Sequence, residues 1–292
     1  MRSLIRPDRP RTCFLVSSVG YGAGVSCSDP ESSEEQLGGG VANVGAVIRR
    51  GDEVQRPAGP HAVAIHELLR LARARGFDGV PKPLALAGGQ ERLEYIAGEV
   101  PVAPFPRWWR TDRTLASTAV LLRRFHDVTE GLDVDQRSLW SQELADPRGG
   151  EVICHNDVCP ENVVYSDGAA VALLDFDYAA PGRRVYDLAQ FAKMCCPLDA
   201  PANAAQIGLG DMNPFARLRL IADAYGLGPG RYEFLDAIFD AVHVGEEFVR
   251  RHVERGDAGF VAMWERRGGE QRVLRRARWL DDNRARMLDA LG

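Results

Sequence analysis

The sequence predicts an α+β fold with a small, β-rich N-terminal part and a larger, mostly helical C-terminal part. Two observations carry this prediction. Short runs of strand-forming residues, separated by glycine turns, fill much of residues 46–56 and 80–96. From residue 214 onward, apolar residues recur every three to four positions, which is the helical period.

The composition bounds the class of protein. The chain has 292 residues, of which 45% are hydrophobic and 26% charged, as in ordinary soluble globular proteins of one large domain or two lobes. Its net charge of −5 argues against nucleic-acid binding, which normally needs a basic excess. No apolar run is long enough to span a membrane. We therefore expect a cytoplasmic protein that binds neither nucleic acid nor membrane.

The chain has six cysteines, and no two of them have the C-x2-C spacing of a zinc site. Cys154, His155 and Cys159 are close in sequence and could bind zinc, but a fourth ligand is missing. In a cytoplasmic protein we expect all six to be free thiols. They are Cys13, Cys27, Cys154, Cys159, Cys195 and Cys196.

Residues 1–30 are predicted to form a poorly ordered extension. The alternative is a secretory signal, because four arginines precede a run of small and apolar residues. Gly20, Gly22 and Gly24 break that run, however, and no clear cleavage site follows it.

A glycine-rich hairpin is predicted next, at residues 37–45, with residues 46–49 as its second strand. Gly39, Gly40 and Asn43 would let backbone N–H groups approach a phosphate closely. The spacing is not that of a P-loop NTPase. A merely flexible turn is the alternative.

The next elements complete the N-terminal part. A third strand covers residues 53–56, and Pro60 begins a helix that runs to about Arg75. Residues 80–84 and 91–96 are read as two further strands.

Helices dominate the rest of the chain. Residues 112–129 form an amphipathic helix in which His126 is expected to be structural. Asp187 is interpreted as the N-cap of a helix over residues 188–196. Further helices are predicted at residues 214–225, 232–253 and 270–291.

One face of the helix at 232–253 is acidic, and two interpretations of it stay open. It is either a solvated face or an acidic wall for a cationic substrate. The residues on this face are Glu233, Asp236, Asp240, His243 and Glu247.

The residues that carry chemistry lie between positions 152 and 175. A short strand at 152–154 leads into a polar loop, and a hairpin of strands at 163–165 and 171–174 follows. The loop contains Asp157 and Asn162, and the hairpin ends in Asp175.

This set fits phosphoryl transfer, in which proteins mainly position reactants and neutralise charge. Asp157 would orient the attacking hydroxyl, while Asn162 and Asp175 would hold Mg²⁺ against the triphosphate of ATP. The alternative is coincidence, because His-x-Asp-x4-Asn or an Asp after a strand means little alone.

The segment from 152 to 178 resembles the catalytic core of the aminoglycoside phosphotransferase and choline kinase group, relatives of the protein kinases. Asn156 stands where this group usually has Gly, and Asp177 where protein kinases have Gly. The resemblance implies a protein-kinase-like fold of two lobes. The N-terminal, nucleotide-covering lobe would span residues 31–97 and the C-terminal, acceptor-binding lobe residues 98–292.

Further roles follow from the resemblance. Arg56 would contact the α- and β-phosphates, and the hinge around Glu94 and Ile96 would pair with adenine. A helix glutamate should pair with Arg56, but His61 stands where that residue is expected and Glu67 comes nearly two turns later.

The resemblance also implies the function, and it suggests that Asp187 braces the catalytic loop. We expect an ATP- and Mg²⁺-dependent kinase that phosphorylates a hydroxyl of a small molecule, such as an aminoglycoside. Kinases for choline, homoserine, a sugar or a macrolide remain alternatives. A nucleotide-binding relative without activity is another.

Overall fold

The computed structural model describes residues 34–37, 46–132, 139–228 and 231–292. The predictions for the extension at 1–30 and for Gly39, Gly40 and Asn43 concern residues outside these ranges.

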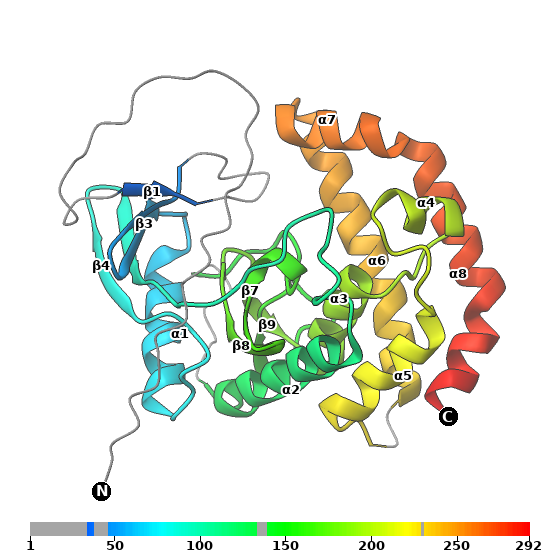
Figure 1. Ribbon diagram of the computed structural model, residues 1–292, viewed down its shortest axis with the longest axis horizontal. Coiled ribbons are helices and arrows are strands. Elements are labelled where there is room, and N and C mark those ends of the chain that lie inside the picture. Colours follow the sequence, from blue (N-terminus) through cyan, green and yellow to red (C-terminus); the bar gives the residue numbers. More distant parts are fainter. Residues whose placement is uncertain (1–33, 38–45, 133–138, 229–230) are drawn as a thin grey trace, which may run out of the picture. The chain divides into compact units, whose positions relative to one another are not determined.

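The N-terminal part is an antiparallel sheet with one helix (Figure 1). Five strands follow the order β1-β2-β3-β5-β4. Helix α1 connects β3 to β4 and buries Ile65, Leu68, Leu69 and Ala72, the apolar stripe that predicted it. The elements are β1 (Glu34–Gln36), β2 (Ile48–Arg50), β3 (Glu53–Pro57), α1 (Ala62–Ala74), β4 (Pro83–Ala87) and β5 (Gln90–Glu94).

The predicted strand at 80–84 is displaced, because β4 begins only at Pro83. Val80 is fully buried, and its carbonyl accepts a hydrogen bond of 2.9 Å from Arg73 on α1. The apolar residue Val80 thus packs in the core without being part of a strand. Its carbonyl bonds to a helix side chain instead of a neighbouring strand.

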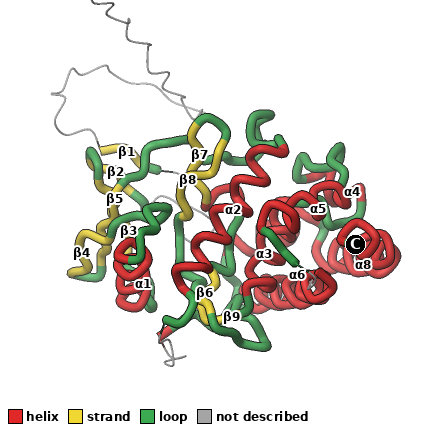
Figure 2. The backbone as a smooth tube through the Cα atoms, turned by 90° about the horizontal axis from the view of Figure 1, so that it is seen from below, coloured by secondary structure: helices red, strands yellow, loops and turns green. Residues whose placement is uncertain are grey.

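The C-terminal part is mainly helical, with two small sheets (Figure 2). Strands β6 and β9 form one of these sheets, and β7 and β8 form the other. The elements are α2 (Asp112–Thr129), β6 (Val152–Cys154), the 3₁₀ turn η2 (Pro160–Asn162), β7 (Val163–Ser166), β8 (Ala169–Leu173), β9 (Ala180–Gly182), α3 (Arg184–Cys195), α4 (Pro201–Gln206), α5 (Pro214–Tyr225), α6 (Arg231–Glu254), α7 (Ala258–Arg267) and α8 (Gly269–Leu291).

Two features near α3 differ from what their sequence suggests. A proline-glycine pair usually marks a turn, but Pro181 and Gly182 are part of β9, where Gly182 lies opposite Val152. A Cβ on Gly182 would lie 2.7 Å from Cys154 Sγ, so glycine is needed for this close pairing. Asp187 does not cap α3, because the helix begins at Arg184 and buries Asp187 completely within its first turn.

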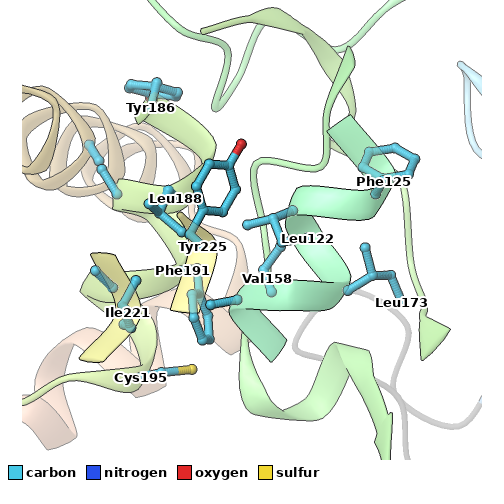
Figure 3. Close-up of a cluster of buried hydrophobic side chains, with 14 of the residues drawn as sticks. Leu122, Phe125, Val158, Leu173, Tyr186, Leu188, Phe191, Cys195, Ile221 and Tyr225 are labelled. Atoms are coloured by element: carbon cyan, nitrogen blue, oxygen red, sulfur yellow. The ribbon is translucent and has the colours of Figure 1, made fainter. Parts of the chain in front are cut away.

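The core of the C-terminal part lies between α2, α3, α5 and the catalytic loop. In Figure 3, Leu122 and Phe125 of α2 lie near Val158 and Leu173, while Leu188 and Phe191 of α3 come from the other side. Val158 is completely buried, so the loop residue next to Asp157 is anchored in the apolar core. This anchoring holds the loop backbone in place.

The segment that leaves the N-terminal sheet after β5 is fixed to β7 by a close backbone contact. Glu99 and Tyr165 exchange two backbone hydrogen bonds, each of 2.8 Å. A Cβ on Gly98 would lie only 2.6 Å from the Tyr165 carbonyl oxygen, so the contact needs glycine here. Nearby, the indole of Trp109 is buried and donates to the Tyr165 hydroxyl, so this tryptophan is a packing residue.

In the described ranges, every helix is too short or too polar to cross a membrane.

Candidate active site

The carboxylate of Asp187 fixes the backbone of the catalytic loop. Its carboxylate accepts hydrogen bonds from the backbone N–H groups of His155 (2.6 Å) and Asn156 (2.8 Å). His126 of α2 binds the same carboxylate through Nε2 at 2.9 Å. Burial alone would raise the pKa of Asp187, but these donors lower it below its ordinary value. The bracing contact expected of Asp187 and the structural role expected of His126 are thus confirmed.

Asn156 has a left-handed backbone, with φ of +65°. Glycine adopts this conformation without strain, and asparagine tolerates it better than most other residues. The Asn156 side chain also donates to the carbonyl of Tyr178 at 3.0 Å. The departure from the usual glycine therefore keeps the loop geometry.

His155 links the loop to the strand that leads into Asp175. Its Nε2 donates to the Leu174 carbonyl at 2.8 Å, and its Nδ1 accepts from the backbone N–H of Asp157 at 3.3 Å. Both ring nitrogens are thus occupied, which disfavours the zinc alternative. Burial raises the pKa of the Cys154 and Cys159 thiols, so both stay protonated and are poor zinc ligands.

Asp157 and Asn162 are hydrogen-bonded to each other. Asn162 Nδ2 donates to the carboxylate of Asp157 and to its carbonyl, both at 2.9 Å. In the described parts of the chain, both of these Asn162 side-chain bonds use the amide nitrogen, which leaves Oδ1 available as an oxygen ligand. The Asn162 carbonyl also accepts from Leu174 N at 2.8 Å, so the loop and the strand before Asp175 run side by side.

The environment of Asp157 suits proton transfer near neutral pH. Burial and the nearby charge of Asp175 raise the pKa of Asp157 to about 7, against the opposing effects of Lys193 and the Asn162 hydrogen bond. The two acids predicted from the sequence therefore lie close enough to affect each other's charge.

Arg56 of β3 reaches Asp175 and the acid two residues later. Its Nη1 lies 2.8 Å from Asp175 Oδ1, and its Nη2 lies 2.6 Å from Asp177 Oδ1. Its Nε lies 2.6 Å from Glu91 Oε1. Burial alone would lower the pKa of Arg56, but these three carboxylates raise it well above its ordinary value. The arginine therefore joins the sheet to the end of the catalytic hairpin.

Comparison with known proteins identifies the family. Residues 97–221 match the model of the phosphotransferase enzyme family. A trifolitoxin immunity protein of Rhizobium leguminosarum bv. trifolii is 34% identical over 211 residues, which cover 69% of this chain and 78% of that protein. This chain belongs to the phosphotransferase enzyme family.

Solved structures of other phosphotransferases share its fold. The amicoumacin kinase hAmiN has a TM-score of 0.57 at 13% identity, and the match covers 87% of this chain and 89% of the kinase. A choline/ethanolamine kinase family protein from Mesorhizobium loti has a TM-score of 0.52 at 16% identity, over 85% of this chain and 92% of that protein. The predicted kinase-like α+β fold is confirmed.

Neither sequence candidate for the helix glutamate contacts Arg56. Glu67 is exposed and faces Arg70 at 3.6 Å, while His61 precedes α1 and contacts the Leu139 carbonyl at 3.1 Å. The carboxylate bound to Arg56 Nε comes instead from Glu91 on β5, which lies directly opposite Arg56 in the sheet. Sequence reasoning missed Glu91, although a glutamate opposite a buried strand arginine is a readable signal.

The residues predicted as the hinge connect β5 to the C-terminal part. The side chain of Glu94 in this segment binds other residues of the N-terminal part. Its carboxylate accepts from Arg73 at 3.2 Å and from the backbone N–H of Lys82 at 3.1 Å. Ile96 follows β5, and within the described residues its backbone N–H and C=O take part in no backbone hydrogen bond. An adenine contact through the Ile96 backbone stays a prediction.

The strands that frame the glycine-rich segment pair as predicted. Leu37 N donates to the Val47 carbonyl at 3.0 Å, next to the ladder between β1 and β2. The connecting residues, with Gly39, Gly40 and Asn43, lie outside the described ranges.

The acidic side chains of α6 are paired with arginines of the same chain. Asp236 pairs with Arg284 at 2.8 Å, and Glu247 with Arg250 at 2.5 Å. Arg183 lies 3.4 Å from the carboxylate of Glu233 and 3.3 Å from that of Asp240. These acids are therefore neutralised within the chain, which weakens the interpretation of the face as a wall for a cationic substrate.

Proposed function

We propose that this phosphotransferase moves the γ-phosphoryl group of ATP to a hydroxyl of a small molecule. The observation that carries the proposal is the cluster of Asp157, Asn162, Asp175 and Arg56. Asn162 donates a hydrogen bond to the Asp157 carboxylate, and Arg56 forms an ion pair with Asp175.

In this proposal Asp157 binds the acceptor hydroxyl and takes its proton as the new O–P bond forms. A carboxyl with a pKa of about 7 holds a proton only weakly at neutral pH, so it can accept one during the reaction and release it afterwards. The hydrogen bond from Asn162 fixes which way the Asp157 carboxylate points.

The cluster also fits a divalent cation. Asp175 offers a carboxylate that is one-third exposed, Asn162 offers an amide oxygen, and carboxylates outnumber the single guanidinium of Arg56. Hard cations such as Mg²⁺ prefer such oxygen ligands. Bound Mg²⁺ would neutralise charge on the transferred phosphoryl group.

Arg56 is proposed to contact the nucleotide phosphates. A guanidinium has five N–H donors in a fixed fork, and the contacts with Glu91, Asp175 and Asp177 leave at least one Nη2 donor for a phosphate oxygen. ATP as donor is supported by the complex of amicoumacin kinase with AMP-PNP and Ca²⁺, a protein of the same fold.

The alternative of an inactive nucleotide-binding relative has lost part of its support. It depended on the missing helix partner of Arg56, and the structure provides Glu91 in that place. The proposed acceptor is a small molecule of the classes on which proteins of this fold act, such as an aminoglycoside, choline, ethanolamine or amicoumacin. We do not propose a cationic preference, because the acids on α6 are paired.

The test is acceptor-dependent ADP formation from ATP and Mg²⁺. The acceptor panel contains aminoglycosides, choline, ethanolamine, amicoumacin and trifolitoxin. Replacement of Asp157 by Asn should reduce turnover of an active acceptor by about 10²–10⁴-fold, the typical contribution of a positioned acid or base. Asp167→Asn is the matched control, because Asp167 is exposed in the β7–β8 turn and asparagine also tolerates its φ of +50°.

Two results would refute the proposal. One is full turnover in Asp157→Asn, and the other is the absence of both nucleotide binding and ADP formation with every acceptor.

A further inference from the structure

A buried chain of polar contacts connects helix α1 to Arg56. His66 Nε2 lies 2.9 Å from Glu91 Oε2, and Glu91 Oε1 lies 2.6 Å from Arg56 Nε. The side chains are 1%, 2% and 9% exposed in the order His66, Glu91, Arg56. Each oxygen of Glu91 thus has its own partner, one from α1 and one from β3.

Such a chain is costly to bury unless each member is paired. A buried carboxylate without partners is strongly destabilising, so Glu91 depends on both neighbours. Glu91 faces Arg56 directly across β3 and β5, which fixes one contact by strand register. His66 lies on the buried face of α1 among apolar residues, which fixes the other by helix packing.

The hydrogen-bond pattern shows which ring nitrogen of His66 faces Glu91. A carboxylate accepts hydrogen bonds, so Nε2 is the donor in this contact. Nδ1 is buried and has no partner in the described part of the structure. The Nε2 contact with Glu91 is therefore what fixes the ring.

Anchoring Nε determines where the rest of the guanidinium points. Because the guanidinium is planar and rigid, fixing Nε against Glu91 aims Nη1 and Nη2 toward Asp175 and Asp177, at 2.8 and 2.6 Å. Without Glu91, Arg56 could rotate about its side-chain torsions, and Nη1 and Nη2 would no longer be held toward Asp175 and Asp177.

We propose that Glu91 and His66 are positioning residues for Arg56, and that they replace the helix glutamate that the family resemblance implied. Glu91 holds the guanidinium, and His66 holds Glu91, so that α1 acts on the phosphate-binding side chain through a carboxylate of the sheet. This inference rests on the proposed function, because it concerns the same nucleotide site.

The test measures the dissociation constant of Mg²⁺·ATP by calorimetry for the full chain. Glu91→Gln should weaken binding at least about tenfold, since it removes one partner of a buried charge pair. His66→Gln should weaken it less, by about threefold, because it acts only through Glu91. For the same reason the double variant should bind no more weakly than Glu91→Gln alone.

The controls keep the same chemistry at positions that are not buried. Glu53→Gln removes a carboxylate of β3 that pairs with Arg92 at the surface, and His61→Gln changes the histidine just before α1. Both should bind Mg²⁺·ATP as the wild type does. Melting temperatures are measured in parallel, because a purely structural role would lower them without changing the affinity of the folded protein.

The outcomes separate this inference from the proposed function. If Arg56→Ala weakens Mg²⁺·ATP binding while Glu91→Gln and His66→Gln bind normally, the positioning role is refuted and the proposed function stands. If the wild type does not bind Mg²⁺·ATP, both fail. Should Glu91→Gln not fold, Glu91→Asp keeps the charge but shortens the side chain; the inference then requires weaker binding in that variant, and normal binding refutes it.

Discussion

At the scale of single residues, the catalytic loop depends on one backbone conformation and one buried acid. Asn156 adopts a left-handed backbone between His155 and Asp157, and Asp187 accepts hydrogen bonds from the N–H groups of His155 and Asn156. The aspartates and Asn162 could be read from the sequence because their spacing is local. Glu91 and His66 were missed, because their contacts join three elements that are separate in the chain. The signal of a glutamate opposite Arg56 becomes readable only once β3 and β5 are paired in register.

The backbone at position 156 can be tested by comparing two substitutions that both remove the Asn156 side-chain bond to Tyr178. Asn156→Gly should be more stable than Asn156→Ala by about 1 kcal/mol, because only alanine is strained at positive φ. Urea unfolding of both variants measures the difference in the free energy of unfolding. Equal stabilities would mean that the bend relaxes at little cost.

The buried carboxylate of Asp187 gives a pH-dependent stability. Its pKa is lowered in the folded state, below the value of about 3.9 expected for the unfolded chain. Its stabilisation is therefore fully present above about pH 4 and is lost as the pH falls through the folded-state pKa. Asp187→Asn should reduce the free energy of unfolding most at pH 7, and the gap to wild type should narrow below pH 4.

Urea titrations at several pH values measure that gap. Asp289→Asn, at an exposed position of α8, is the control and should show no gap at any pH. A gap for Asp187→Asn that is constant with pH would contradict the explanation.

At the scale of elements, the sequence predicted the helices and strands whose pattern is strong and missed those defined by pairing. The apolar period indicated α1, α2, α5, α6 and α8 closely. Strand β9 was missed because Ala-Pro-Gly has no strand pattern and exists only through its register with β6. The early start of α3 was missed because Asp187 was taken for its N-cap. The Asp187 carboxylate instead accepts hydrogen bonds from the catalytic loop.

The contact between β7 and the segment after β5 offers a prediction at the scale of elements. Gly98→Ala would place a methyl group 2.4 Å from Val164 and 2.6 Å from the Tyr165 carbonyl, so the Glu99–Tyr165 pairing should open. We expect a lower melting temperature and faster amide hydrogen exchange at Glu99 and Tyr165. Gly228→Ala, where a Cβ meets no atom within 4 Å, should change neither measurement.

At the scale of the whole molecule, one of the places where the two parts meet is a group of charges. Arg56 comes from the sheet, and Asp175 and Asp177 come from the segment after the β7–β8 hairpin. The sequence could place Arg56 and Asp175 in one site only through the family resemblance. Physical pattern alone could not bring together residues separated by 119 positions.

Binding of Mg²⁺·ATP should stabilise the folded protein as a whole. At a concentration 100 times the dissociation constant, the gain is about 2.7 kcal/mol, which is visible as a rise in melting temperature. The rise should shrink when EDTA removes Mg²⁺ or when Asp175 is replaced by Asn. Thermal unfolding with and without each addition measures it, and an Asp175→Asn protein that responds like wild type would exclude Asp175 as a metal ligand.

The buried thiols have a consequence for chemical attack on the protein. Cys159 lies between Asp157 and Asn162 in the catalytic loop, yet it is buried, as are Cys154, Cys195 and Cys196, and burial raises the pKa of all four thiols and keeps them protonated. Electrophiles and oxidants react with the exposed thiolate, so these four sulfurs should stay unmodified as long as the chain is folded. Covalent inhibitors aimed at a cysteine beside the catalytic aspartate would therefore find no nucleophile there.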